Sequence, residues 1–203
     1  MAGDTHSVDI GDDDLLPPWS TVFDVIQATD TNDWVLVGGL MVQLHARRVN
    51  IPPRATKDVD LIVDVAANGA SVAHIATALL RIGFEPVVPA SRREPIYRFH
   101  RDAEQVDLMV ADHLPVRLKP RFMTRPAFAV TAGEQSLRRR DTFVLTSTTR
   151  SLTIGAPDVL GALISKGAAY VIDSRDPGRH LDDAKARRNL EALVTAAPLD
   201  LRS

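Results

Sequence analysis

The stretch "RATKDVDLIVD", residues 54–64, decides the interpretation of this chain. It places Asp58 and Asp60 two positions apart in an apolar run, directly after a basic loop that contains prolines. Side chains at i and i+2 of a strand face the same side, so the two carboxylates project together while Val59 and Leu61 face the opposite layer. Neighbouring carboxylates repel each other, and a divalent cation with oxygen ligands removes that repulsion. The pattern indicates either a metal site or a pair of solvated acids at a strand edge.

Two further motifs bear on that choice. The run "WVLVGG", residues 34–39, is typical of a short buried strand that ends in paired glycines before a helix, where free backbone N–H groups favour phosphate oxygens. The alternative for Gly38 and Gly39 is a plain tight turn. Asp107 lies alone in the apolar strand pattern "QVDLMV", residues 105–110, and supplies a third carboxylate.

The order of the predicted elements indicates a single mixed domain. Residues 15–29 form a predicted helix opened by Pro18. Further helices are predicted at residues 40–48, 69–84, 156–172 and 180–197. Strand patterns occupy residues 33–39, 57–65, 85–89, 95–101, 104–111, 141–147 and 150–155, and the basic stretch 117–140 has no clear pattern. We therefore expect an α+β (mixed α/β) fold, with a mixed sheet flanked by helices and a C-terminal helical part.

Composition sets the class of protein. Apolar residues make up 45% of the 203 and charged residues 25%, which is typical of a soluble globular chain. The sequence has no cysteine, so disulfides and thiolate metal sites are excluded. The acidic start "MAGDTHSVDIGDDD" lacks a signal pattern and no apolar run is long enough to span a membrane, so we expect a cytoplasmic protein without a membrane partner.

Charge is unevenly distributed along the chain. Residues 1–33 contain eight aspartates and no Lys or Arg, and we expect residues 1–14 to form a flexible acidic arm. Residues 117–150 contain eight basic residues against Glu134 and Asp141. Such a run is either a solvated face or a strip that binds a polyanion.

Taken together, "WVLVGGLMVQLHARR", "PRATKDVDLIV", "QVDLMV" and "VLGALISKGAAYVIDSRDPGRHLDDA" resemble a known family. They are similar to the nucleotidyltransferase fold of DNA polymerase β, and more narrowly to nucleotidyltransferase toxins of the AbiEii/AbiGii type, including the MenT group. The resemblance covers about residues 34–195. Two features depart from the family pattern: the connection from Gly39 to Asp58 is longer than usual, and Met41 replaces a small residue. The resemblance implies a nucleotidyltransferase core at residues 15–155 with C-terminal helices, 156–203, packed on it.

The resemblance also implies a role for particular residues. Gly38, Gly39, Thr56, Lys57 and Lys166 would bind the nucleotide. Mg²⁺ or Mn²⁺ would be held by Asp58, Asp60 and Asp107, which would act as catalytic residues with Lys166 and Asp183. The neighbouring Asp182 is the alternative to Asp183. From the basic segment we predict an RNA-binding set: Lys119, Arg121, Arg125, Arg138, Arg139 and Arg140.

By resemblance, the chain is expected to be a metal-dependent toxin of a toxin–antitoxin system. It would transfer a nucleoside monophosphate from an NTP such as ATP to the 3′ end of tRNA and so block translation, and its partners would be the NTP, tRNA and a cognate antitoxin protein. The alternatives are a nucleotidyltransferase that modifies a protein or a small hydroxyl compound such as an antibiotic, and a binding module without catalysis. A basic segment favours a polyanionic acceptor over a small compound.

Overall fold

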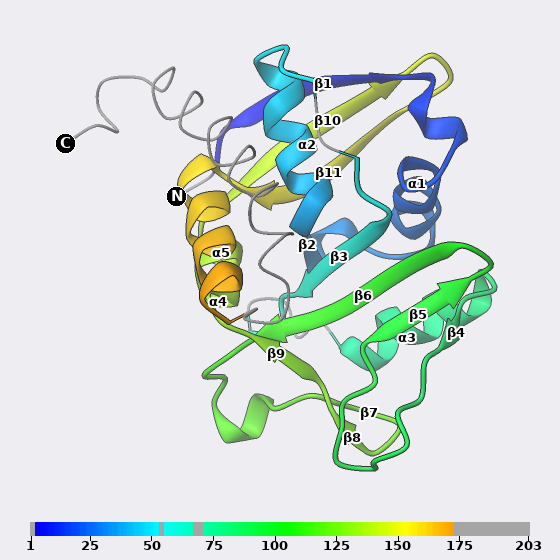
Figure 1. Cartoon of the computed structure of the whole chain (residues 1–203), viewed down its shortest axis with the longest axis vertical. Coiled ribbons are helices and arrows are strands. Elements are labelled where there is room, and N and C mark those ends of the chain that lie inside the picture. The colour runs from blue at the N-terminus through cyan, green and yellow to red at the C-terminus, as the bar shows by residue number, and fades with distance from the viewer. Residues whose placement is uncertain (1–2, 53–54, 67–70, 173–203) are drawn as a thin grey trace.

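A computed structural model describes residues 3–52, 55–66 and 71–172 (Figure 1). In chain order its elements are β1 (Thr5–Gly11), η1 (Asp12–Leu15), α1 (Trp19–Ala28), η2 (Thr31–Asp33), β2 (Trp34–Val37), α2 (Gly38–Arg48), β3 (Asp58–Val63), α3 (Val72–Arg81), β4 (Glu85–Pro86), β5 (Arg98–Arg101), β6 (Glu104–Ala111), η3 (Val116–Leu118), β7 (Arg121–Phe122), β8 (Arg125–Pro126), β9 (Phe128–Val130), α4 (Gly133–Arg138), β10 (Arg140–Ser147), β11 (Ser151–Pro157) and α5 (Val159–Ile172).

The largest sheet is mixed. Its strand order is β2-β3-β6-β5-β4, and β9 also pairs with β6. β3 runs parallel to β6, whereas β2 is antiparallel to β3 and β5 is antiparallel to β6. This arrangement confirms the predicted mixed α/β class. The second predicted C-terminal helix, at residues 180–197, lies outside the described residues.

A second sheet has the order β1-β10-β11, and it corrects the expectation of a flexible arm over residues 1–14. β1 runs parallel to β10, and Val8 and Ile10 on it are each only 1% exposed. Their alternation with polar residues is the pattern of a half-buried strand, but it is short and surrounded by aspartates. The pairing partner lies more than 130 residues later in the chain, so a local pattern does not reveal it.

The acidic segment after β1 is also fixed in place. Asp14 is fully buried and accepts hydrogen bonds from the side chains of Ser147, Thr149 and Arg150. The hydrogen bond from Ser147 contributes most to lowering the pKa of Asp14. Arg150 lies over the ring of Phe23, 4.5 Å from its centroid. The basic residue at the end of the 117–150 segment is therefore a structural partner of the N-terminal segment.

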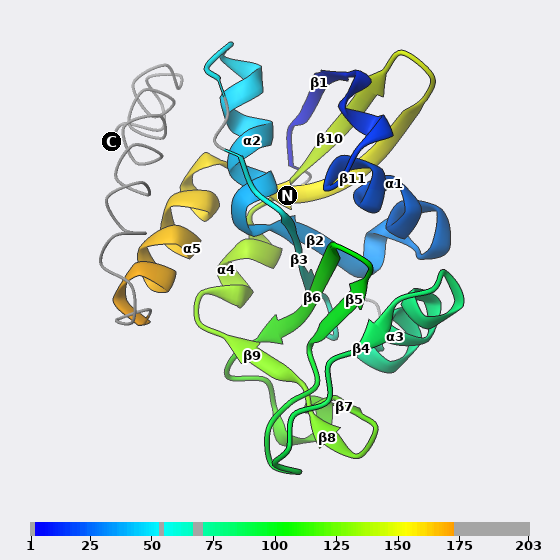
Figure 2. The same cartoon turned by 45° about the vertical axis from the view of Figure 1, so that its right-hand side comes forward.

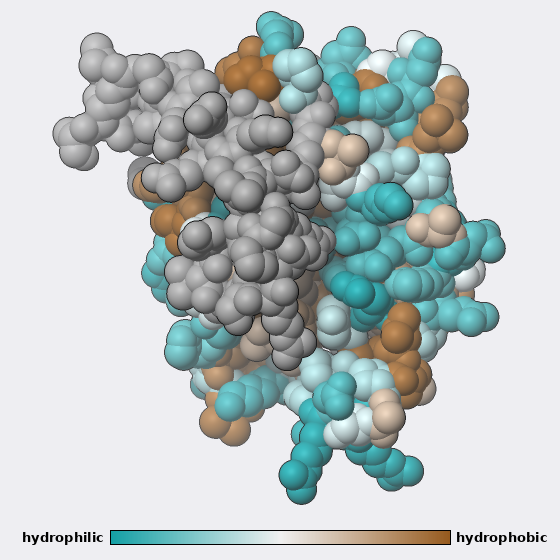
Figure 3. All heavy atoms as spheres, in the orientation of Figure 1, coloured by the Kyte–Doolittle hydropathy of each residue, from teal (hydrophilic) through white to brown (hydrophobic). Residues whose placement is uncertain are grey.

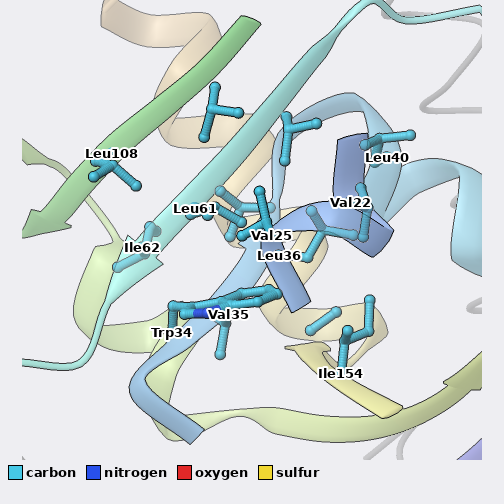
Figure 4. Packing of buried hydrophobic residues seen from close by; sticks show 14 of the residues in the cluster. Val22, Val25, Trp34, Val35, Leu36, Leu40, Leu61, Ile62, Leu108 and Ile154 are labelled. Atoms are coloured by element: carbon cyan, nitrogen blue, oxygen red, sulfur yellow. The ribbon is translucent and has the colours of Figure 1, made fainter. Parts of the chain in front are cut away.

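Helices cover the sheets from both sides (Figure 2). α4 and α5 pack against each other and, with α2, lie on one side of the large sheet, while α1 and α3 pack on the other. Side chains of α1, β2, β3, β6 and β11 meet in one hydrophobic cluster, which includes Val22, Trp34, Leu61, Leu108 and Ile154 (Figure 4). No helix in the described ranges is long and apolar enough to cross a membrane.

His45 gives this core a pH dependence. It is fully buried on α2, Nε2 donates a hydrogen bond to the carbonyl of Pro157 at 2.9 Å, and Nδ1 has no partner among the described residues. Burial lowers its pKa from 6.5 to about 4, because a second N–H would lack an acceptor. The pKa of His45 is lower in the folded state than in the unfolded state. The stability that neutral, buried His45 contributes is therefore fully present above pH 6.5 and is lost as the pH falls towards 4.

We expect the free energy of unfolding to fall between pH 7.5 and pH 5, with about 2 kcal/mol of the decrease due to His45. Urea unfolding at the two pH values measures this decrease. In His45→Gln, which does not titrate in this range, the decrease should be smaller. His100→Gln, at an exposed histidine, should retain the wild-type decrease. Equal pH dependence in wild type and His45→Gln would contradict the assignment.

Candidate nucleotide and metal site

The glycine pair forms the turn from β2 into α2. Gly38 has φ 68°, a left-handed conformation that favours glycine. A Cβ on Gly38 would lie 1.9 Å from Oδ2 of Asp60, and a Cβ on Gly39 would lie 2.5 Å from Oγ1 of Thr56. Both positions therefore require glycine for close approach. The turn brings four of the predicted site residues into contact: Gly38, Gly39, Thr56 and Asp60.

The three predicted carboxylates lie on one face of the large sheet. β3 and β6 are parallel neighbours, with Asp60 directly opposite Asp107, and Asp58 lies two residues before Asp60 on β3. Paired residues of neighbouring strands project to the same face. On the opposite face Val59 and Leu61 are fully buried, as the sequence pattern predicts.

Arg98 belongs to this site, and sequence reasoning missed it. It lies opposite Asp107 on β5 and donates two hydrogen bonds to that carboxylate, Nε to Oδ1 at 3.0 Å and Nη2 to Oδ2 at 2.8 Å. Gln105 Nε2 adds a third contact, 3.2 Å from Oδ1. A signal for it is present in the sequence, because the two-residue connection Asp102–Ala103 pairs Arg101 with Glu104 and so aligns Arg98 with Asp107.

The electrostatics of Asp60 reflect its crowded position. Its pKa is raised to about 6, first by burial and then by the negative charges of Asp107 and Asp58. The charges of Lys166 and Arg98 act in the opposite direction. Lys166 is half-buried on α5, so the tertiary fold places the predicted lysine near the predicted aspartates.

The three carboxylates have the chemistry that a divalent cation requires, but their side chains are not arranged as a complete set of metal ligands. A cation beside Asp60 would offset both its burial and its repulsion from Asp58 and Asp107. However, the described ranges contain no group of three acidic, His or Cys side chains close enough to hold a metal ion. The Asp107 carboxylate binds Arg98 instead. Asp58 and Asp60 are therefore the better placed candidates for metal ligands, and Arg98 would compete with a cation for Asp107.

The remaining predicted residues of the site are less well placed. Lys57 precedes β3 and is exposed. Asp182 and Asp183 both lie outside the described residues, so their predicted roles stay predictions.

The predicted RNA-binding residues lie in different parts of the fold. Arg138 is exposed on α4 and pairs with Glu134, whereas Arg139 pairs with Asp158 at the start of α5. Arg140 donates to the carbonyls of Thr31 and Asn32, which ties β10 to η2. Lys119, Arg121 and Arg125 lie apart from these, on and around the β7–β8 hairpin.

Comparison with known proteins gives a match among solved structures. No family model matches the chain, and no curated protein matches it. A solved structure that matches is the solution structure of the antibiotic-resistance factor ANT(2'')-Ia, at 12% identity and a TM-score of 0.42, over 87% of this chain and 89% of that chain. At this level of similarity, the function must be inferred from the residues of this chain.

Proposed function

We propose that this protein is a metal-dependent nucleotidyltransferase that uses an NTP. The observation that carries the proposal is the contact between the Gly38–Gly39 turn and Asp60, beside Asp58 and Asp107. Backbone N–H groups at the start of α2 are suited to phosphate oxygens, and adjacent carboxylates are suited to the cation that accompanies them. Phosphoryl transfer depends on this positioning and charge neutralisation more than on covalent chemistry.

Each group has a role in the transfer. The acceptor hydroxyl oxygen would form a bond to the α-phosphorus while Asp107 helps to take up the hydroxyl proton, the bond from that phosphorus to the bridging oxygen would break, and pyrophosphate would leave. Asp58 and Asp60, with Asp107, would hold Mg²⁺ or Mn²⁺, and the cation would supply charge neutralisation for the phosphates and the attacking oxygen. Gly38 and Gly39 would bind the phosphates, with Thr56 and Lys57 flanking them. Lys166 would neutralise the triphosphate, and Asp183 takes its catalytic role from the family resemblance alone.

The proposed acceptor is the 3′ end of tRNA, which makes the protein a toxin with a cognate antitoxin partner. This finer assignment rests on the family resemblance and on the basic residues. The test is incubation of the protein with total tRNA, Mg²⁺ and each radiolabelled NTP in turn. We expect label on tRNA from at least one NTP. Label on a protein or a small hydroxyl compound, with none on tRNA, would establish the alternative acceptor class.

The pairing of Arg98 with Asp107 predicts competition with the metal. A guanidinium that donates two hydrogen bonds to a carboxylate competes with a cation for the negative charge and the lone pairs of the same oxygens. We expect Arg98→Met to tighten Mn²⁺ binding about tenfold or more, because a hydrogen bond to a charged group contributes roughly 1.5–3 kcal/mol. Titration of the protein with Mn²⁺, followed by the electron paramagnetic resonance of the free ion, measures this directly.

The matched control is Arg101→Met on the same strand. Arg101 pairs with Asp24 and Glu104, away from Asp60, so its loss should leave Mn²⁺ affinity unchanged. Unchanged or weaker binding in Arg98→Met would mean that Arg98 does not compete for the metal.

A further inference from the structure

Two segments far apart in sequence form a basic lobe. Residues 87–97 connect β4 to β5, and residues 113–126 lie between β6 and β9. Arg125 joins them, because its Nη1 donates to the carbonyl oxygens of Ser91 at 2.5 Å and Glu94 at 3.3 Å. Figures 1 and 2 both show the two segments side by side at the lower end of the molecule.

The lobe has a strong charge imbalance. It carries six Lys or Arg residues against Glu94 alone, in a chain whose net charge is −2. Most of these cations are exposed, and within the described ranges none is paired with a carboxylate. The six are Arg92, Arg93, Arg117, Lys119, Arg121 and Arg125.

Arginines elsewhere in the described ranges are mostly neutralised. Six of them form ion pairs with aspartate or glutamate: Arg47, Arg98, Arg101, Arg138, Arg139 and Arg150. The lobe therefore concentrates cations that lack an anionic partner. An external polyanion would supply the missing negative charge.

The tip of the lobe displays an apolar side chain at a conformational cost. The β7–β8 turn consists of Met123 and Thr124, with φ 48° and 67°, between the paired residues Phe122 and Arg125. Left-handed backbone disfavours residues that carry a Cβ, and β-branched residues above all. Although this backbone conformation is unfavourable for Met123, its apolar side chain is not buried in return and is 58% exposed. Figure 3 shows hydrophilic side chains projecting from this end of the molecule, with hydrophobic ones beside them.

The lobe is firmly attached to the strands of the candidate site. Phe122 packs on Phe99 of β5, with ring centroids 5.8 Å apart, and Tyr97 stacks on Phe128 of β9 at 4.5 Å. Tyr97 directly precedes Arg98, the partner of Asp107. A ligand held by the lobe would therefore lie beside β5, the neighbour of β6, whose Asp107 contacts Arg98.

We propose that the basic lobe binds the phosphate backbone of an RNA acceptor, with Arg92, Arg93 and Arg117 as contacts beside Lys119, Arg121 and Arg125. Arginine predominates, and its planar guanidinium matches phosphate oxygens. The exposed side chains of Val88, Val116 and Met123 would contact bases. This inference rests on the proposed function and places the acceptor on the lobe, away from Arg138, Arg139 and Arg140.

The test is binding of fluorescently labelled tRNA to the full-length protein across a salt series. Arg92→Ala/Arg117→Ala removes one cation from each segment of the lobe. We expect about tenfold weaker binding at 0.15 M salt and a log–log salt slope shallower by about 1.4, since each lost phosphate contact of single-stranded RNA contributes about 0.7. The conservative pair Arg92→Lys/Arg117→Lys should retain the wild-type slope.

The control is Arg48→Ala/Arg81→Ala, which changes the net charge equally at exposed residues of α2 and α3. Equal weakening in this control would show an effect of overall charge and overturn the assignment to the lobe. Absence of tRNA binding by wild type at low salt would also overturn it, and would favour an acidic protein as the partner. Transfer of label to tRNA by wild type is measured separately. Transfer without an effect of the lobe variants would contradict the lobe assignment alone, and binding at the lobe without transfer would contradict the proposed function alone.

Discussion

Asp60→Asn is expected to lose nucleotidyl transfer by at least about 10²- to 10³-fold, the range found when one electrostatic contact is removed from a transition state. The substitution keeps the volume of the side chain, and with it the contact to Gly38, but removes the negative charge that a divalent cation requires. Initial rates of label transfer from a radiolabelled NTP measure the loss. Mn²⁺ binding should weaken in parallel.

The same variant should be at least as stable as wild type. Burial and the charges of Asp107 and Asp58 raise the pKa of Asp60 to about 6, so the ionised carboxylate destabilises the folded protein above that pH. At pH 7.5 without metal we expect the free energy of unfolding to rise by up to about 3 kcal/mol. Loss of function with gain of stability distinguishes a functional acid from a structural one.

Asp64→Asn is the matched control. Asp64 is an even number of residues from Asp58 and Asp60, so the alternation of a strand would place it on the same face. However, it follows the last residue of β3, and its backbone N–H donates a hydrogen bond to the carbonyl of Asp33. Its replacement should leave transfer and Mn²⁺ binding unchanged. Wild-type turnover by folded Asp60→Asn would exclude Asp60 from the metal site.

Gly38→Ala is expected to disrupt the site from the phosphate side. The added Cβ would lie 1.9 Å from Oδ2 of Asp60, and the backbone there has φ 68°. The left-handed conformation costs about 1–2 kcal/mol for a residue with a Cβ, and the collision must move the carboxylate or the turn. A displacement of about 1 Å is enough to reduce a transfer rate roughly 10²-fold. Rates of transfer and unfolding in urea measure the two effects.

Gly167→Ala provides the comparison within the candidate site. Gly167 adjoins Lys166 on α5, and a Cβ there would meet nothing within 4 Å. Since alanine favours helix over glycine by about 0.5–1 kcal/mol, this variant should be slightly more stable with unchanged transfer. Equal activity of Gly38→Ala and wild type would show that the turn tolerates a Cβ and does not position Asp60.

Local sequence pattern predicted most of the elements around the site. Short apolar runs interrupted by aspartate indicated β3 and β6, and helical periodicity with terminal signals identified α1, α2, α3 and α5. The strands β7, β8 and β9 and the helix α4 were not predicted, because they lie within residues 117–140, a stretch with no clear apolar period, and their formation depends on pairing and packing with other segments.

The sequence by itself determined which side chains are candidates for the proposed chemistry. The D-x-D pattern on an apolar strand places Asp58 and Asp60 on one face whatever the rest of the fold does, because side chains of a strand alternate. The paired glycines likewise predicted a turn at the start of a helix, and the structure places Gly38 and Gly39 there, against Asp60 and Thr56.

Only the tertiary structure decided what those groups face. Strand register placed Asp107 opposite Asp60 and paired its carboxylate with Arg98. Helix packing brought the charge of Lys166 close to Asp60. The tertiary structure also separates the residues of the basic segment. The cations around the β7–β8 hairpin are mostly exposed, whereas Arg139 pairs with Asp158 and Arg140 donates to the backbone of Thr31. The physical reason is that these partners meet through hydrogen-bond register and packing between segments distant in sequence, which local periodicity does not encode.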